Sequence, residues 1–170
     1  MKKVFLIVLI LFLSSTLFSQ VKVVNDNYKF RIEYSKLWKS GTKIETDKKD
    51  VINYSFSKND NKMTSSIIAF KFSVQTNLDD FIYKLEKDFN LNIPEKTGGY
   101  TTINGDGYEG KTADYKDKDS YEKIYYYTTT RDSSGDYFCY MIRFIGDAKL
   151  KLNDFSSEVT NIANTFKLNI

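Results

Sequence analysis

The sequence contains no histidine and a single cysteine, Cys139. Histidine is the commonest general base and metal ligand, so its absence excludes the usual histidine-assisted serine or cysteine catalysis and the common kinds of zinc site. Cys139 stands in a segment rich in aromatic residues, and we interpret it as a small buried residue and not as a nucleophile. A lone cysteine also forms no disulfide within the chain.

The acidic residues form no catalytic or metal-binding pattern. One segment matches the middle of a calcium-binding loop, but its first and twelfth positions, Thr102 and Ala113, lack a carboxylate. Glu109 and Asp114 are five residues apart, so on a regular strand they face opposite sides and do not form the acid pair of a glycoside hydrolase. We therefore predict no catalytic residues, no metal site and no cofactor, and interpret the protein as not an enzyme.

Tyrosine and phenylalanine are plentiful, with 13 of each, and the tyrosines are densest in one strand-like segment. Tyr121, Tyr125 and Tyr127 share one face of that segment, and Ile124 and Tyr126 share the other. Two interpretations stay open. The strand is buried on both faces, or Tyr121, Tyr125 and Tyr127 form an aromatic platform for a protein, glycan or apolar ligand. These three tyrosines are the candidate site residues.

Strand patterns must position these side chains. In the first half of the chain apolar and polar residues alternate, which predicts strands over 28–34, 51–57 and 64–74, with a shorter one over 41–46. A polar run joins the second and third of the longer strands as a hairpin. Trp38, the only tryptophan, is expected to close the core.

The apolar period then changes to that of a helix. The repeating residues are Leu78, Phe81, Ile82, Leu85 and Phe89. We predict a helix over 78–91. Lys84 lies four residues from Asp80 and from Asp88, which is the spacing of ion pairs on the outer face of a helix.

The second half of the chain returns to strand patterns, predicted over 100–103, 108–116, 121–131 and 136–145. A second helical stripe follows: Leu152, Phe155, Val159, Ile162 and Phe166. Strands joined by hairpins, with helices segregated from them, indicate an α+β domain with an antiparallel β-sheet and two main helices packed on it.

Three segments of this pattern resemble the PsbP-like fold family: 28–38, 103–108 and 164–166. The family includes the PsbP protein of photosystem II, a Ran-binding nuclear import factor and exported bacterial proteins of unknown role. Ser35 stands where the family typically has a proline. The resemblance covers about 25–168 and implies an α/β/α sandwich. It implies no catalytic residues, because the characterised members act as binding or assembly factors.

The N-terminus has the three parts of a secretory signal: Lys2 and Lys3, an apolar run over 4–13, and small polar residues after it. The apolar run is shorter than the roughly 20 residues that span a bilayer. We predict a cleavable signal peptide over 1–19 and a single domain over 20–170. An uncleaved membrane anchor is the competing interpretation. Gln20 follows the predicted cut, where a lipoprotein would need a cysteine.

Charge and export together narrow the function. The two signal lysines account for two of the three net positive charges of the chain, which leaves +1 on the remainder and gives no electrostatic case for binding nucleic acid. We expect a secreted or periplasmic protein without a stable membrane anchor after cleavage. The predicted function is a non-catalytic binding or assembly module of the cell envelope with an envelope protein as partner. The alternative is a carrier of a small apolar or aromatic ligand.

Overall fold

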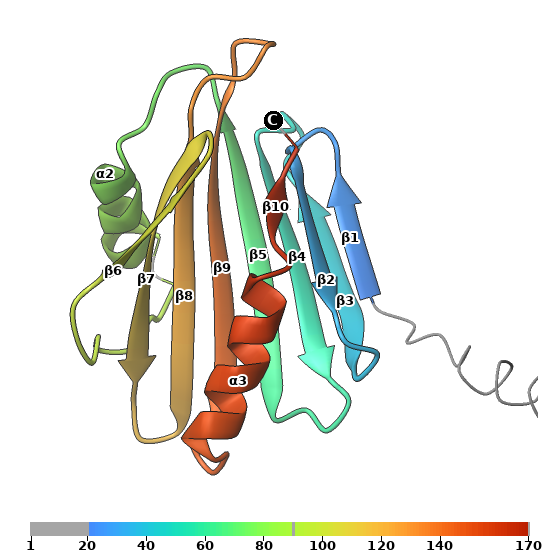
Figure 1. The fold of residues 1–170 in the computed structure, drawn as a ribbon, viewed down its shortest axis with the longest axis vertical. Coiled ribbons are helices and arrows are strands. Elements are labelled where there is room, and N and C mark those ends of the chain that lie inside the picture. Colours follow the sequence, from blue (N-terminus) through green and yellow to red (C-terminus); the bar gives the residue numbers. More distant parts are fainter. Residues whose placement is uncertain (1–20, 90, 170) are drawn as a thin grey trace, which may run out of the picture.

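The computed structural model describes residues 21–89 and 91–169 (Figure 1). A large antiparallel sheet contains β3 (Trp38–Glu45), β4 (Val51–Lys58), β5 (Met63–Phe72), β6 (Thr101–Gly105), β7 (Tyr108–Lys116), β8 (Ser120–Thr129) and β9 (Tyr137–Asp147). Its strand order is β3–β4–β5–β9–β8–β7–β6. A small sheet contains β1 (Val21–Asn25), β2 (Phe30–Tyr34) and β10 (Lys167–Leu168), in the order β1–β2–β10. The signal peptide predicted over 1–19 lies outside the described residues.

The large sheet lies between two layers (Figure 1). Helix α2 (Leu78–Tyr83), which continues into the π-helical turn η1 (Lys84–Asp88), packs on one face. Helix α3 (Leu152–Ala163) and the small sheet pack on the other face. The predicted α+β class with two main helices on an antiparallel sheet is confirmed. None of the helices in the described part of the chain is long and apolar enough to cross a membrane.

Side chains of one parity along β9 form the centre of the α3 face: Phe138, Tyr140, Ile142 and Phe144. The small sheet seals this face, because the ring of Tyr34 stacks on that of Phe56 with centroids 4.3 Å apart. Trp38 is buried, as expected of the residue that closes the core. Its indole Nε1 donates to Glu158 Oε1 of α3 at 2.7 Å, which ties the edge strand β3 to the helix.

The alternate parity of the same strands forms a second core under α2. Leu78, Phe81, Ile82 and Leu85 of the helical segment pack there against β7, β8, β9 and Phe70 of β5. Asn77 begins the helix by accepting hydrogen bonds on Oδ1 from the backbone of Asp79 at 2.8 Å and Asp80 at 3.3 Å. Both faces of β8 and β9 are therefore buried, and these two strands lie at the centre of the sandwich.

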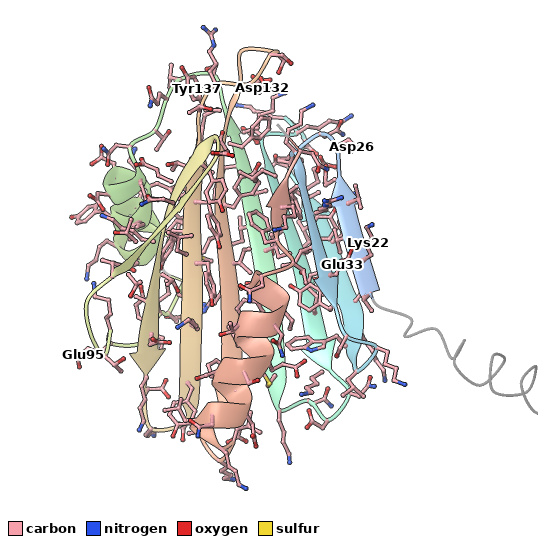
Figure 2. All side chains as sticks on the ribbon, viewed as in Figure 1. Lys22, Asp26, Glu33, Glu95, Asp132 and Tyr137 are labelled. Atoms are coloured by element: carbon pink, nitrogen blue, oxygen red, sulfur yellow. The ribbon has the colours of Figure 1, made fainter. Side chains whose placement is uncertain are left out.

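The predicted hairpin over 51–74 is confirmed, because β4 and β5 pair in antiparallel register. Two short strands were not predicted. β1 follows the predicted signal peptide and pairs with β2, where Lys22 and Glu33 lie opposite each other (Figure 2), and β10 has only two residues. The last helix also ends earlier than its apolar stripe. After Ala163, Thr165 accepts a hydrogen bond on Oγ1 from the backbone of Glu33 at 2.9 Å, and Phe166 packs against Phe30 and not along the helix.

Candidate functional site

The three candidate tyrosines of β8 lie on the face of the sheet that α3 covers. Tyr125 and Tyr127 are buried, with 8% and 4% of their surface exposed, and the ring of Tyr127 stacks on that of Phe166 at 5.0 Å. Tyr121 is half-buried near the start of the strand. Tyr126, on the opposite face, is also buried. The strand is thus buried on both faces, and its buried tyrosines present no platform to solvent.

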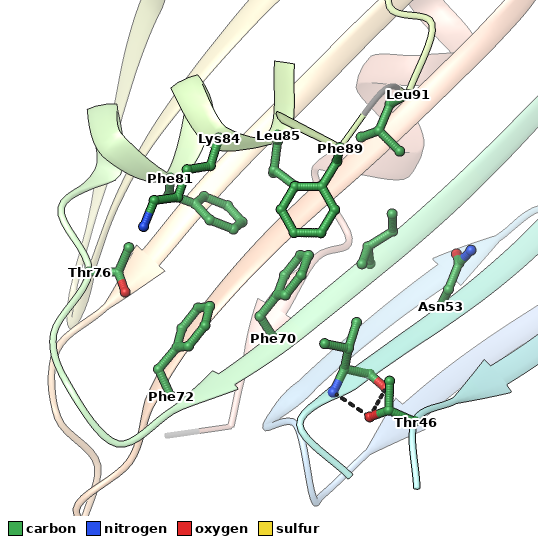
Figure 3. A pocket seen from close by; sticks show the side chains of 12 residues that line it. Thr46, Asn53, Phe70, Phe72, Thr76, Phe81, Lys84, Leu85, Phe89 and Leu91 are labelled. Carbon is green, nitrogen blue, oxygen red and sulfur yellow. Dashed lines mark hydrogen bonds between the residues drawn. The ribbon is translucent and has the colours of Figure 1, made fainter. Parts of the chain in front are cut away.

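A groove opens on the other face of the large sheet, between the α2–η1 segment and strands β4 and β5 (Figure 3). Its volume is about 600 Å³. Eight apolar side chains, three neutral polar side chains and one lysine line it: Val51, Ile68, Phe70, Phe72, Phe81, Leu85, Phe89 and Leu91; Thr46, Asn53 and Thr76; and Lys84. We call these twelve residues the α2 groove. None of the candidate tyrosines belongs to it.

The groove arises because α2 and η1 cover only part of their face of the sheet. The helical segment packs on β7, β8, β9 and Phe70 of β5, so the rest of this face of β4 and β5 lies beside it with no helix of the described chain over it. Strand alternation directs Asn53 and Ile68, which pair across β4 and β5, to this face. Phe89 lines the groove from the helical side, and 56% of its surface is exposed.

The π-helical turn sets which residues face the groove. The backbone of Phe89 donates to the carbonyl of Lys84 at 3.3 Å, a bond that spans five residues instead of the four of an α-helix. Lys84 and Phe89 therefore lie one turn apart on the groove side. The expected ion pairs of Lys84 with Asp80 and Asp88 on an outer face were wrong: neither forms between these described residues.

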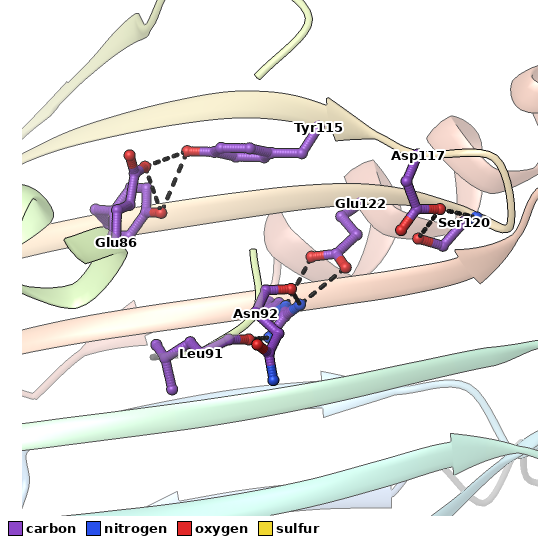
Figure 4. A network of polar contacts seen from close by, with 9 residues as sticks. Glu86, Leu91, Asn92, Tyr115, Asp117, Ser120 and Glu122 are labelled. Atoms are coloured by element: carbon purple, nitrogen blue, oxygen red, sulfur yellow. Dashed lines mark hydrogen bonds and ion pairs between the residues drawn. The ribbon is translucent and has the colours of Figure 1, made fainter. Parts of the chain in front are cut away.

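Glu86 fastens the π-helical turn to the sheet (Figure 4). Its Oε1 accepts hydrogen bonds from the hydroxyls of Tyr100 at 2.8 Å, of Tyr126 at 3.0 Å, and of Tyr115. The hydroxyls of Tyr115 and Tyr126 are also 3.2 Å apart. Three phenols on one carboxylate oxygen hold η1 over β7 and β8, and so fix the helical wall of the groove.

Burial keeps these tyrosine hydroxyls protonated. It raises the pKa of Tyr100 to about 12, and the hydrogen bond and charge of Glu86 add to that effect. Burial raises the pKa of Tyr115 and of Tyr126 still further. All three hydroxyls therefore remain donors to Glu86 at neutral pH.

A buried ion pair holds the segment that follows η1 (Figure 4). Arg143 donates from Nε to Glu122 Oε2 at 2.7 Å and from Nη2 to Glu122 Oε1 at 2.8 Å. Its Nη1 also donates to the carbonyl of Leu91 at 2.8 Å, and its Nη2 to that of Asn92 at 3.3 Å. Leu91 lines the groove, so the pair of charges positions the segment at one end of it.

Polar side chains lie toward both ends of the groove: Thr76 and Lys84 at one, and Asn53 at the other (Figure 3). The side-chain oxygen of Asn53 is buried and accepts no hydrogen bond within the described residues. The groove therefore combines an apolar middle with a few polar groups, which is the usual make-up of a small-molecule site.

No cysteine or carboxylate among the described residues lines the groove. Cys139 is buried beneath α2, and burial raises the pKa of its thiol to about 12, so the thiol stays protonated at neutral pH. Across 21–89 and 91–169, no three His, Cys, Asp or Glu side chains come together as a metal site. The arrangement can bind an apolar molecule.

Sequence reasoning found the two walls of this groove but not the groove. The alignment of Ile68, Phe70 and Phe72 on one strand face was visible, and so was the helical stripe that contains Phe81 and Phe89. Each pattern alone is that of a core face. Only the structure shows that the two faces meet incompletely.

No family model matches the chain, and no curated protein matches it. Solved structures that share its fold include the following two. LpqN, described as involved in cell envelope biogenesis of Mycobacterium tuberculosis, is 10% identical with a TM-score of 0.54, over 94% of this chain and 95% of LpqN. A protein of Bacteroides thetaiotaomicron VPI-5482 is 12% identical with a TM-score of 0.50. That match covers 88% of this chain and 48% of the other, so this chain spans about half the length of that protein.

These likenesses establish a shared α+β fold and nothing finer. At 10% and 12% identity no residue role passes from one protein to the other. The PsbP-like family suggested by the segments around Trp38 and Gly107 stays a prediction. The fold and the α2 groove are the two observations from which a function can be argued.

Proposed function

We propose that this protein is a non-catalytic binding module of the cell envelope that carries a small apolar molecule in the α2 groove. The observation that carries the proposal is the groove itself, with eight apolar side chains around about 600 Å³. Ligand sites in proteins have volumes of roughly 300–1,000 Å³ and predominantly apolar linings. The fold shared with LpqN, a protein described as involved in cell envelope biogenesis, supports the envelope setting, as does the predicted signal peptide.

The energetics favour an occupied groove. The ring of Phe89 lies 6.3 Å from that of Phe70, edge to face, and yet 56% of Phe89 is exposed. Each Å² of apolar surface that a ligand removes from water contributes about 25 cal/mol. A molecule in the groove would bury the exposed part of Phe89 and the half-buried ring of Phe72 on β5. This gain requires no rearrangement of the helical wall, because Glu86 and Arg143 already hold η1 and the segment that follows it in place.

Binding of the neutral apolar dye Nile red tests the proposal. We expect saturable fluorescence enhancement with one dye per chain, and native mass spectrometry of freshly purified protein should show a bound small molecule. Phe89→Glu places a charge in the groove and should abolish dye binding. Tyr83→Glu is the matched control, because Tyr83 is an equally exposed aromatic residue of the same helical segment, with 64% of its surface exposed, but does not line the groove.

Dye binding that is equal in the wild type, Phe89→Glu and Tyr83→Glu would refute the groove as the site. Protein that purifies empty and binds no apolar dye would refute the carrier function. If it also bound a purified envelope protein through Phe89, the groove would be a protein-docking site, which is the other partner class that the sequence suggests.

A further inference from the structure

We infer that the ligand of the α2 groove is a single-chain amphiphile whose head group is a carboxylate, held by Lys84. This inference rests on the proposed function and adds to it the chemistry of one end of the ligand. It requires a cation without a partner at the groove, a second donor beside it, and a reason for the head group to avoid the opposite end. The described residues provide all three.

Lys84 is the one charged side chain among the twelve that line the groove. Its ammonium group forms no ion pair within the described residues, although Asp80 and Asp88 are four positions away. The π-helical turn brings Phe89 into line with Lys84 on the groove side. Lys111, a lysine on the same face of the sheet, is paired with Asp79.

A second donor lies at the same end. Figure 3 places Thr76 and the Lys84 ammonium toward the end where Phe72 and Phe81 meet. The hydroxyl of Thr76 forms no hydrogen bond with any described residue, so it is available to a ligand. One ammonium and one hydroxyl suit a singly charged, two-oxygen head group such as a carboxylate. A charge-assisted hydrogen bond to Lys84 is about twice as strong as a neutral one.

Among the residues that the structure describes, the opposite end has no charge to attract an anion. There Asn53 presents a neutral amide, whose buried oxygen accepts no hydrogen bond within the described residues. The middle of the groove, around Phe70 and Phe89, offers only apolar surface. The order along the groove is therefore cation and hydroxyl, apolar body, neutral amide. This order fixes the direction in which an anionic amphiphile lies.

Displacement of bound Nile red by dodecanoate and by dodecanol tests the inference, since the two probes share a chain and differ in charge. We expect dodecanoate to bind the wild type about tenfold more tightly than dodecanol, with a preference that declines as salt is added. Lys84→Met should remove the preference by weakening dodecanoate alone, and Lys84→Arg should retain it. Lys87→Met, an exposed lysine of the same π-helical turn outside the groove, should behave as the wild type.

The outcomes separate this inference from the proposed function. Equal binding of dodecanoate and dodecanol to the wild type, or an unchanged preference in Lys84→Met, would overturn the anionic head group and leave an apolar carrier. A preference lost equally in Lys84→Met and Lys87→Met would also overturn it, because general charge and not the groove lysine would then be responsible. If neither probe displaces the dye and Phe89→Glu still binds it, the proposed function itself fails.

Discussion

At the scale of single residues, Glu86 is the contact on which the shape of the groove depends. One carboxylate oxygen receives three tyrosine hydroxyls, two of them from the buried residues Tyr115 and Tyr126. A hydrogen bond to a charged group contributes about 1.5–3 kcal/mol, and a buried hydroxyl left without its acceptor costs a similar amount. We expect Glu86→Ala to lower the free energy of unfolding by about 2 kcal/mol in urea denaturation, and to weaken Nile red binding.

Asp88→Ala is the control for this effect, because Asp88 is an exposed acid of the same turn with no role in the tyrosine network. It should change the unfolding free energy by less than about 0.5 kcal/mol. Equal losses in the two variants would mean that removal of any charge from η1 is responsible and that the network contributes nothing of its own.

A second residue-scale prediction concerns the buried pair of Arg143 and Glu122. Glu122 is 4% exposed, so Arg143→Met leaves a carboxylate uncompensated in the interior, at a cost of about 3–5 kcal/mol. The double variant Glu122→Met with Arg143→Met should recover most of that loss, because an apolar pair of similar volume often matches a buried ion pair. Thermal or urea unfolding of the single and double variants measures both quantities.

Arg31→Met supplies the comparison, since Arg31 is exposed on the small sheet, and a change within about 0.5 kcal/mol is expected. A double variant that is as unstable as Arg143→Met would contradict the ion-pair account. The loss would then come from the hydrogen bonds that Arg143 donates to the carbonyls of Leu91 and Asn92.

At the scale of elements, periodicity predicted what is regular and missed what is not. Alternation along β4, β5 and β9 predicted these strands and their two faces, because apolar residues recur there at every second position. The helix expected over 78–91 is α-helical only to Tyr83. The apolar spacing of a π-helical turn differs by one residue from that of an α-helix, and a five-residue segment is too short to reveal it.

The elements missed entirely are those that tertiary pairing creates. β10 has two residues, and it exists because the chain turns at Thr165 and pairs with β2. The groove likewise depends on tertiary packing, because its position is set by how far α2 extends across the sheet. The candidate tyrosines were chosen for local density, whereas the groove residues come from separate segments that no local pattern connects.

The π-helical turn supports an element-scale prediction. Deleting exposed Lys87 removes the extra residue of η1, and Phe89 would then follow Lys84 by four residues, which is the repeat of an α-helix. The groove face and Glu86 keep their positions. We expect the shortened protein to fold with an unfolding free energy no lower than that of the wild type, and to bind Nile red.

Deletion of Tyr83 is the matched control, because it lies before Glu86 and also removes one exposed residue. It would rotate Leu85 out of the core and Glu86 away from the tyrosines, so both stability and dye binding should fall. If the Lys87 deletion were as damaging as the Tyr83 deletion, the π-helical turn would be a requirement of the fold and not an insertion in an α-helix.

At the scale of the whole molecule, the sheet is sealed on one side and partly open on the other. The α3 face is closed by α3 and the small sheet, whose buried aromatic residues interlock with those of β4 and β9. The α2 face is closed over β7, β8, β9 and Phe70 of β5, and no helix of the described residues covers the rest of β4 and β5. The α3 face is therefore closed, and the α2 face can receive a ligand. The helical wall beside that ligand is held in place by the hydrogen-bond networks of Glu86 and Arg143.

The same architecture makes the fold sensitive to alkali. Burial raises the pKa of eight tyrosines above the ordinary value of about 10: Tyr28, Tyr34, Tyr100, Tyr115, Tyr125, Tyr126, Tyr127 and Tyr140. The folded protein retains these protons after the unfolded chain has begun to lose them. Their contribution to stability is therefore complete below about pH 10 and declines as the pH rises through that value toward the folded pKa.

Within that window each deeply buried tyrosine removes about 1.4 kcal/mol of stability per pH unit, so several together exceed the roughly 5–15 kcal/mol that holds a domain folded. We expect tyrosinate absorbance and loss of circular dichroism to appear in one cooperative step above about pH 10. Tyr127→Phe should move that step to higher pH, because one fewer buried group ionises, whereas Tyr83→Phe, at an exposed position, should leave it unchanged. Tyrosinate absorbance that develops fully while the circular dichroism stays native would show that these hydroxyls are accessible, and the aromatic core would then be far looser than its packing indicates.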